Sequence, residues 1–210
     1  MWVIGIFTAI IFSLSASATF AQTSKGAAGT TLILIPGAGG ASPNDFLIRN
    51  IAAFAAHGLQ TKVATSAEEA VAAATAIRGS GGKALLVGMS AGTPTVAEAI
   101  AQGAPVAGAV FVSGTLMPGS AQRSVVAALG GPGKLPATLV VHHRKDQCPL
   151  TPPSSVSAFL GWSGGKARAS WIDGGQAGGR PCGPMSAHGF IGQDQAAVAA
   201  IAGFARSRGK

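Results

Sequence analysis

One stretch of the chain, residues 84–93, constrains the fold more than any other. A short apolar run from Ala84 to Val87 leads directly into Gly88-Met-Ser90-Ala-Gly92, and an alanine-rich segment follows. This order predicts a buried strand, a sharp turn and a helix, with Ser90 at the apex of the turn. Because glycine lacks a Cβ atom, the two glycines let the backbone pack closely enough to expose the serine hydroxyl above the edge of a sheet.

Apolar runs of this kind recur along the chain and alternate with segments of helical character. The strands that we expect lie at residues 31–35, 59–64, 83–87, 106–112, 137–142 and 167–172, and the helices at residues 44–57, 66–77, 93–102, 120–129, 153–162 and 190–205. Continuous apolar runs are typical of strands that are buried on both faces of a parallel sheet. The alternation predicts a three-layer α/β domain, with a mostly parallel sheet of about six strands flanked by helices.

The first 21 residues differ in character from the rest of the chain. Residues 2–14 are almost wholly apolar, and the small residues that follow favour cleavage after Ala18 or Ala21. The apolar run is shorter than the ~20 residues that a membrane-spanning helix needs. We therefore expect residues 1–21 to be a signal peptide and residues 22–210 to form a single domain without a membrane span, in a periplasmic or secreted protein. An uncleaved N-terminal anchor is the alternative.

The net charge of +8 comes from basic residues that are scattered along the chain. The sequence contains no tyrosine, and aromatic residues do not alternate with the basic ones. Proteins that bind single-stranded nucleic acid combine basic grooves with aromatic stacking residues. We therefore expect no nucleic-acid partner and interpret the charge as solvated surface.

The segment Gly88-Met-Ser90-Ala-Gly92 matches the nucleophile elbow of the α/β-hydrolase superfamily, in the strand–turn–helix context that this pattern requires. The chain resembles a small member of that superfamily, with no room for a large cap domain. The resemblance implies that Ser90 is a nucleophile, activated by a base that accepts its proton. The alternative is a turn serine that caps the following helix.

In this family the acid and the histidine follow the serine in that order, and the chain offers candidates for both. His188 lies between the last expected strand and the last expected helix, where the family places its histidine. Asp146 follows the strand at residues 137–142, where it would orient His188 and stabilise the imidazolium. Asp173, after the final strand, is the nearest competitor, and Asp194 fits better in the last helix.

A cysteine lies beside each of these two loops. Cys148 is two residues after Asp146, and Cys182 is six residues before His188. In an exported protein, a pair of cysteines favours a disulfide over two free thiols. Such a disulfide would tie the acid loop to the histidine loop and hold a glycine-rich loop in place. A zinc site formed by Cys148 and the histidines close to it in sequence is the alternative.

The resemblance also implies two N–H donors for the oxyanion that forms during acyl transfer. One would come from Ala91, the residue after the nucleophile, and the other from the loop at residues 36–40, with Ala38 as the expected donor and Gly37 or Gly39 as alternatives. The same glycines resemble a nucleotide-binding loop, but the third glycine of the dinucleotide fingerprint and the acidic residue after the next strand are missing.

These features predict an exported serine hydrolase that cleaves a small-molecule carboxylic ester without a metal or a cofactor. The same three residues could instead cleave a thioester, an amide or a lactone, because a fold does not fix a substrate. A non-catalytic exported binding domain on a hydrolase scaffold is the third interpretation.

Overall fold

A parallel sheet forms the centre of the molecule. The structure, a computed structural model, describes Met1 and residues 29–119, 123–175 and 178–209, so the predicted signal peptide lies outside the described residues apart from Met1. Within these ranges six strands pair in the order β2-β1-β3-β4-β5-β6, and all neighbours are parallel. The strands are β1 (Thr30–Ile35), β2 (Gln60–Val63), β3 (Lys83–Met89), β4 (Gly108–Val112), β5 (Thr138–His143) and β6 (Ala167–Ile172).

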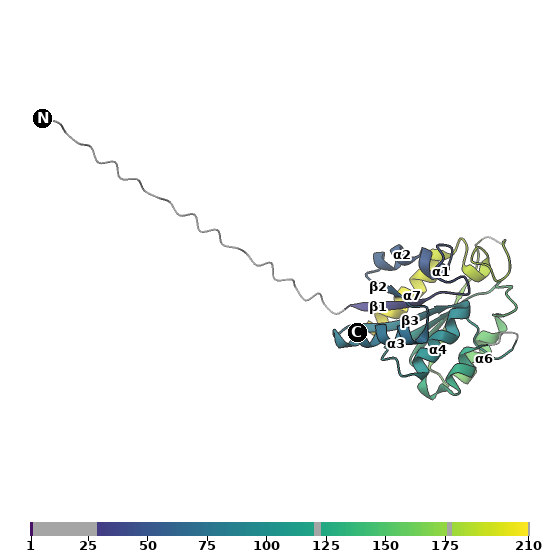
Figure 1. The fold of residues 1–210 in the computed structure, drawn as a ribbon. Helices are drawn as coiled ribbons and strands as arrows, with labels where there is room; N and C mark the ends of the chain where they lie inside the picture. Colours follow the sequence, from purple (N-terminus) through teal and green to yellow (C-terminus); the bar gives the residue numbers. More distant parts are fainter. Residues whose placement is uncertain (2–28, 120–122, 176–177, 210) are drawn as a thin grey trace.

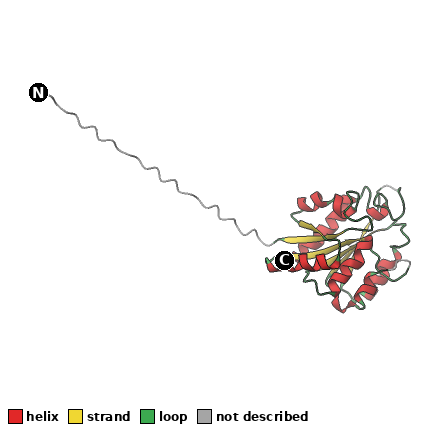
Figure 2. Ribbon diagram, in the orientation of Figure 1, coloured by secondary structure: helices red, strands yellow, loops and turns green. Residues whose placement is uncertain are grey.

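Helices cover both faces of this sheet, which gives the three layers seen in Figures 1 and 2. One face carries α1 (Phe46–Arg49), α2 (Ile51–Ala56) and α7 (Asp194–Gly209). The other face carries α3 (Ala67–Gly79), α4 (Thr93–Ala101), α5 (Val125–Leu129) and α6 (Ser154–Trp162). Short 3-10 helices η1 (Ser90–Gly92), η2 (Pro132–Lys134) and η3 (Ala187–Gly189) lie in the connections. The predicted three-layer α/β architecture is confirmed.

Each face of the sheet has its own apolar core, and β1 shows how one strand serves both. Ile33 and Ile35 pack with the residues of α3 and α4, whereas Leu32 and Leu34 pack with those of α1, α2 and α7. Side chains of a strand alternate between the two faces, so a strand in the middle layer must be apolar at every position. This requirement explains the unbroken apolar runs in the sequence.

The single helix expected at residues 44–57 is wrong, because the structure divides it at Asn50. The backbone of Asn50 has φ −101° and ψ 11°, and α1 ends there before α2 begins. The Asn50 side chain donates to the Phe46 carbonyl over 2.8 Å and to the Asp194 carboxylate over 2.6 Å. The second contact joins α1 to α7, and helical periodicity along the sequence gives no signal of it.

The start of the last helix also differs from the expectation. The predicted helix began at Phe190, but Phe190 has a left-handed φ of 59° and closes the turn η3. The helix α7 begins at Asp194, which agrees with the prediction that Asp194 belongs to it. Residues 190–193 precede the helix and belong to the loop that carries His188.

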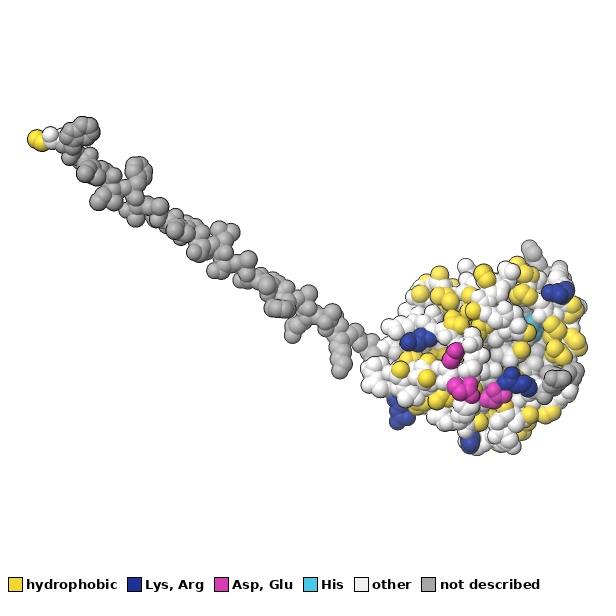
Figure 3. Space-filling model, viewed as in Figure 1, with side chains coloured by type: hydrophobic (Ala, Val, Ile, Leu, Met, Phe, Trp, Pro, Cys, Tyr) yellow, Lys and Arg dark blue, Asp and Glu magenta, His cyan; other side chains and the backbone are white. Residues whose placement is uncertain are grey.

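Charged side chains are sparse on the face in Figure 3, where they lie among large areas of neutral and apolar atoms. Of the helices in the described ranges, none has the length and apolar character that crossing a membrane requires.

Candidate active site

Ser90 occupies the sharp turn that the sequence predicted. It follows β3 directly and has a left-handed φ of 48°, a conformation that L-residues other than glycine rarely adopt. The hydroxyl of Thr93, the first residue of α4, donates to the Ser90 carbonyl over 2.7 Å. Strained backbone persists only where its surroundings hold it, and such residues concentrate at functional sites.

The two glycines of this turn are needed for steric reasons. A Cβ atom at Gly92 would lie 2.4 Å from the carbonyl oxygens of both Ile35 and Pro36, at the end of β1. A Cβ atom at Gly88 would lie 2.7 Å from a methyl group of Val96 and 2.9 Å from the Gly92 carbonyl oxygen. The turn therefore packs backbone against backbone, which brings Ser90 next to the loop that follows β1.

The sheet register brings further polar residues to the same edge. Met89 pairs with Val112, and Val112 pairs with Val141, so Ser90, Ser113 and His142 follow equivalent positions on three neighbouring strands. Ser113 is buried and, like Ser90, has a left-handed φ, of 41°. Its hydroxyl donates to the carbonyl of His188 over 2.8 Å. Ser113 thus holds the histidine loop over the strand next to that of Ser90.

Asp146 and His188 are brought together as predicted. His188 Nδ1 lies 2.9 Å from Asp146 Oδ2, and the side chains are 2% and 0% exposed, respectively. The other carboxylate oxygen of Asp146 accepts the amide of Cys148 over 2.9 Å. A hydrogen bond at Nδ1 directs the other ring nitrogen of the histidine, Nε2, to act as the proton acceptor. Among the described residues, no hydrogen bond joins the Ser90 hydroxyl to His188.

The competing acids lie elsewhere. Asp173 is exposed, and its carboxylate accepts the amide of Gly174 over 2.8 Å. Asp194 forms an ion pair with Arg49, with Nε and Oδ1 2.7 Å apart. In the part of the chain that the structure describes, Asp146 is the only carboxylate bonded to His188.

A second histidine lies against the same carboxylate. His142, at the end of β5, has a fully buried side chain whose Nε2 is 3.4 Å from Asp146 Oδ2. The contact lacks hydrogen-bond geometry, and neither ring nitrogen has a partner among the described residues. Burial lowers the pKa of His142 from 6.5 to about 4, although the nearby charge of Asp146 acts in the opposite direction. His142 is therefore neutral at neutral pH.

Arg49 also forms hydrogen bonds with the histidine loop. Its guanidinium donates to the carbonyl of Gly189, next to His188, and to the carbonyl of Pro184 over 3.3 Å. Gly189 is itself tightly packed, since a Cβ atom there would lie 2.0 Å from the Pro184 oxygen. The loop around His188 is thus held by hydrogen bonds from Arg49 in α1 and from Ser113, the residue after β4.

The loop after β1 contains the residues predicted to supply the second oxyanion donor, Ala38 with Gly37 and Gly39 as alternatives. The amide of Gly37 donates to Asp45 Oδ2 over 3.0 Å, so it is already engaged. Within the described residues, the backbone amides of Ala38 and Gly39 donate no hydrogen bond. Burial raises the pKa of Asp45, against the opposing effect of the amides of Gly37 and Leu47. This pattern favours Ala38 or Gly39 over Gly37 as the free donor.

The structure contains the Cys148–Cys182 disulfide, with the two Cα atoms 4.6 Å apart. It joins the loop of Asp146 to the loop of His188 across 34 positions of sequence. Because the Cys148 sulfur is bonded to Cys182, the alternative of a zinc thiolate at Cys148 does not apply to this form of the protein. In the described ranges there is no group of three or more His, Cys, Asp or Glu side chains suited to a metal ion.

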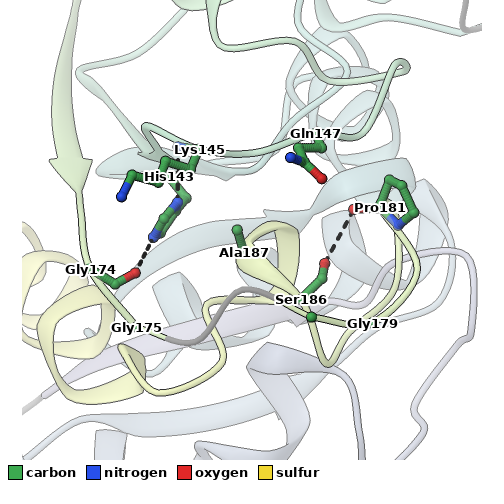
Figure 4. Close-up of a pocket in the computed structure, with 10 residues that line it drawn as sticks. His143, Lys145, Gln147, Gly174, Gly175, Gly179, Pro181, Ser186 and Ala187 are labelled. Carbon is green, nitrogen blue, oxygen red and sulfur yellow. Dashed lines mark hydrogen bonds between the residues drawn. The ribbon is translucent and has the colours of Figure 1, made fainter.

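A cavity of about 130 Å³ lies between these two loops (Figure 4). Its walls include residues beside Asp146 and residues beside His188, namely Lys145, Gln147, Ser186 and Ala187. His143 crosses it: Nδ1 accepts the amide of Lys145 over 3.0 Å, and Nε2 donates to the Gly174 carbonyl over 3.0 Å. Because Ser90 is not part of the lining, the cavity flanks the acid–base pair rather than the nucleophile.

Three residues of this site were not predicted from the sequence, namely Thr151, Ser113 and Arg49. The hydroxyl of Thr151 contacts both Asp146 and His188. Ser113 could have been noted, since it ends an apolar run in the same way as Ser90 does. Thr151 and Arg49 carry no comparable signal, because their partners lie in other segments of the chain.

Comparisons with known proteins identify the fold. No family model and no curated protein matches the chain. A candidate hydrolase of the α/β superfamily from Xanthomonas campestris pv. campestris is 18% identical, with a TM-score of 0.57 over 86% of this chain and 99% of that one. A candidate α/β hydrolase of unknown function from Agrobacterium tumefaciens is 14% identical, with a TM-score of 0.61 over 89% and 88%.

The esterase domain of a Rhodothermus marinus protein is 13% identical, with a TM-score of 0.57 over 86% of this chain and 87% of that one. Identities at this level show a shared fold, while the activity depends on the site itself. Together with the parallel six-stranded sheet and its flanking helices, these similarities show that the chain has the α/β-hydrolase fold.

Proposed function

We propose that this protein is an exported serine hydrolase that cleaves a carboxylic ester through a covalent acyl-enzyme. The observation that carries the proposal is the buried 2.9 Å hydrogen bond between Asp146 and His188. This pair lies at the sheet edge where Ser90 has its strained turn. An esterase domain among the proteins of similar structure agrees with this chemistry.

In the proposed mechanism, the Ser90 hydroxyl attacks the acyl carbon while His188 Nε2 accepts its proton. Asp146 holds the Nδ1–H of His188 and stabilises the imidazolium that forms. The amides of Ala91 and Ala38 stabilise the oxyanion. His188 then protonates the leaving alcohol, and a water molecule activated by the same histidine hydrolyses the acyl-enzyme.

Export is the second part of the proposal. The apolar N-terminal segment of the sequence supports it, and so does the disulfide, because disulfides persist in oxidising compartments. We propose cleavage after Ala18 or Ala21 and a mature domain from residue 22 onward.

The test is labelling with a fluorophosphonate probe, followed by an ester panel of increasing acyl length. We expect the wild type to label, and Ser90→Ala to lose both labelling and turnover by at least about a thousandfold. Asp146→Asn should lower kcat to a similar extent, whereas the matched control Asp173→Asn should not. Turnover of thioesters, amides or lactones without esters would change the substrate class. A wild type that neither labels nor turns over any of them would contradict the enzyme proposal and favour a binding domain.

A further inference from the structure

We propose that Thr151 is a positioning residue that fixes the proton on His188 Nδ1, an inference that rests on the proposed function of His188. Thr151 lies in the loop between Asp146 and α6, and its side chain is completely buried. Its hydroxyl oxygen is 3.1 Å from Asp146 Oδ2 and 3.1 Å from His188 Nδ1. It is therefore within hydrogen-bond reach of both members of the pair.

The chemistry of these groups determines the direction of each hydrogen bond. An ionised carboxylate can only accept, so the single hydrogen of the Thr151 hydroxyl must point to Asp146 Oδ2. Only the lone pairs of the hydroxyl then face His188 Nδ1, and this nitrogen must carry a proton. The proton is shared between Asp146 Oδ2 at 2.9 Å and Thr151 Oγ1 at 3.1 Å. The lone pair of His188 is left on Nε2, as a general base for Ser90 requires.

The loop itself holds Thr151 in this position. The Thr151 amide donates to the Cys148 carbonyl over 3.1 Å, and the Cys148 amide donates to Asp146 Oδ1 over 2.9 Å. Asp146 thus receives one hydrogen bond from Cys148, two residues further on, and one from Thr151, five residues further on. The disulfide at Cys148 anchors this loop to the histidine loop.

Few other titratable groups face this cluster. His142 approaches the same carboxylate oxygen from the end of β5, at 3.4 Å. The ring of His143 is turned toward Gly174, and Asp173, after β6, is exposed. Helix α6, which follows Thr151, contains no titratable residue. Among the described residues, the hydrogen-bond partners of the His188 ring are therefore Asp146 and Thr151.

The test compares Thr151→Val, which keeps the shape but removes the hydroxyl, with Thr151→Ser, which keeps the hydroxyl. Without the Thr151 oxygen, Asp146 is the one remaining acceptor for the Nδ1 proton, so we expect a smaller fraction of the neutral His188 ring to carry its proton on Nδ1. The ¹⁵N chemical shifts of the two His188 ring nitrogens measure this fraction without substrate. In enzyme assays kcat should be lower by about tenfold and KM unchanged.

Thr151→Ser should restore both the fraction of His188 protonated on Nδ1 and kcat. Thr138→Val, which removes a buried hydroxyl that donates to the Pro136 carbonyl at the other end of β5, is the control and should change neither. An unchanged fraction of Nδ1-protonated His188 in folded Thr151→Val would overturn the proposal. Loss of every esterase signal in the wild type would instead contradict the proposed function, and the NMR measurement would still test Thr151.

Discussion

The nucleophile half of the candidate site and its acid–base half are held by different kinds of contact. The residues that shape the Ser90 turn lie within three positions of it, namely Gly88, Gly92 and Thr93, and Gly92 also packs against the end of β1. His188 depends on distant residues, since its contacts with Asp146 and Ser113 span 42 and 75 positions of sequence. The turn of the nucleophile is therefore built from one short segment that rests on a neighbouring strand, whereas the acid–base pair is assembled only when the whole chain folds.

The largest effect on stability should come from Gly92→Ala, which disrupts the Ser90 turn. The new Cβ atom would lie 2.4 Å from two carbonyl oxygens at the end of β1, and backbone atoms in the middle of a sheet cannot move aside cheaply. We expect no soluble folded protein, or a loss of more than about 4 kcal/mol in the free energy of unfolding. Soluble yield and urea unfolding measure this.

Gly39→Ala is the matched control, because nothing lies within 4 Å of a Cβ atom there and its φ is ordinary. Its stability should stay within about 0.5 kcal/mol of the wild type. A Gly92→Ala protein as stable as Gly39→Ala would show that the turn does not require close backbone packing.

This difference explains which parts of the structure could be predicted from the sequence. The strands follow from unbroken apolar runs, and β6 spans the predicted residues 167–172. The Ser90 turn follows from a five-residue pattern in which a Cβ atom at Gly88 would meet the Gly92 carbonyl oxygen. Both signals are local, so a reader of the sequence can find them without knowing the fold.

The missed features depend on contacts between distant segments. Asn50 divides a helix because its side chain reaches Asp194, 144 positions away. Arg49 holds the histidine loop through Gly189, 140 positions away. Thr151 is five residues from Asp146 but gains its role only when His188 arrives from 37 positions away. Contacts of this kind leave no periodic pattern in the sequence, so they could not be predicted from it.

The next largest effect should come from the acid–base half of the site, which is assembled from distant segments. The double variant Cys148→Ser and Cys182→Ser removes the disulfide that joins the Asp146 loop to the His188 loop. The bond closes a loop across 34 positions, for which loop entropy gives about 3 to 4 kcal/mol of stabilisation. Because the Cys148 amide holds Asp146, kcat should fall as well. Urea unfolding and ester turnover, with and without reductant, measure both effects.

Reductant should lower both the free energy of unfolding and kcat of the wild type, and it should change neither in the double variant. If the double variant matched the oxidised wild type in both stability and kcat, the disulfide would not hold the acid loop in place, and hydrogen bonds alone would assemble this half of the site.

The smallest of the three effects is the dependence of stability on pH. It concerns His142, which lies against Asp146 in the acid–base half of the site. Its folded-state pKa of about 4 is below the unfolded value of 6.5, so the unfolded chain binds more protons between these pH values. The free energy of unfolding therefore rises with pH across this window and falls on acidification. The pKa difference corresponds to about 3 kcal/mol, which is lost as the pH falls from 6.5 to about 4.

In His142→Gln, the fall in stability between pH 7 and pH 4 should be smaller than in the wild type by about this amount, as urea unfolding at several pH values can measure. His57→Gln, which removes an exposed histidine at the end of α2, should keep the wild-type dependence. If both variants lost stability on acidification as the wild type does, His142 would not be held neutral by its burial beside Asp146. The acid sensitivity would then have to come from other groups of the assembled half, such as the Asp146–His188 pair itself.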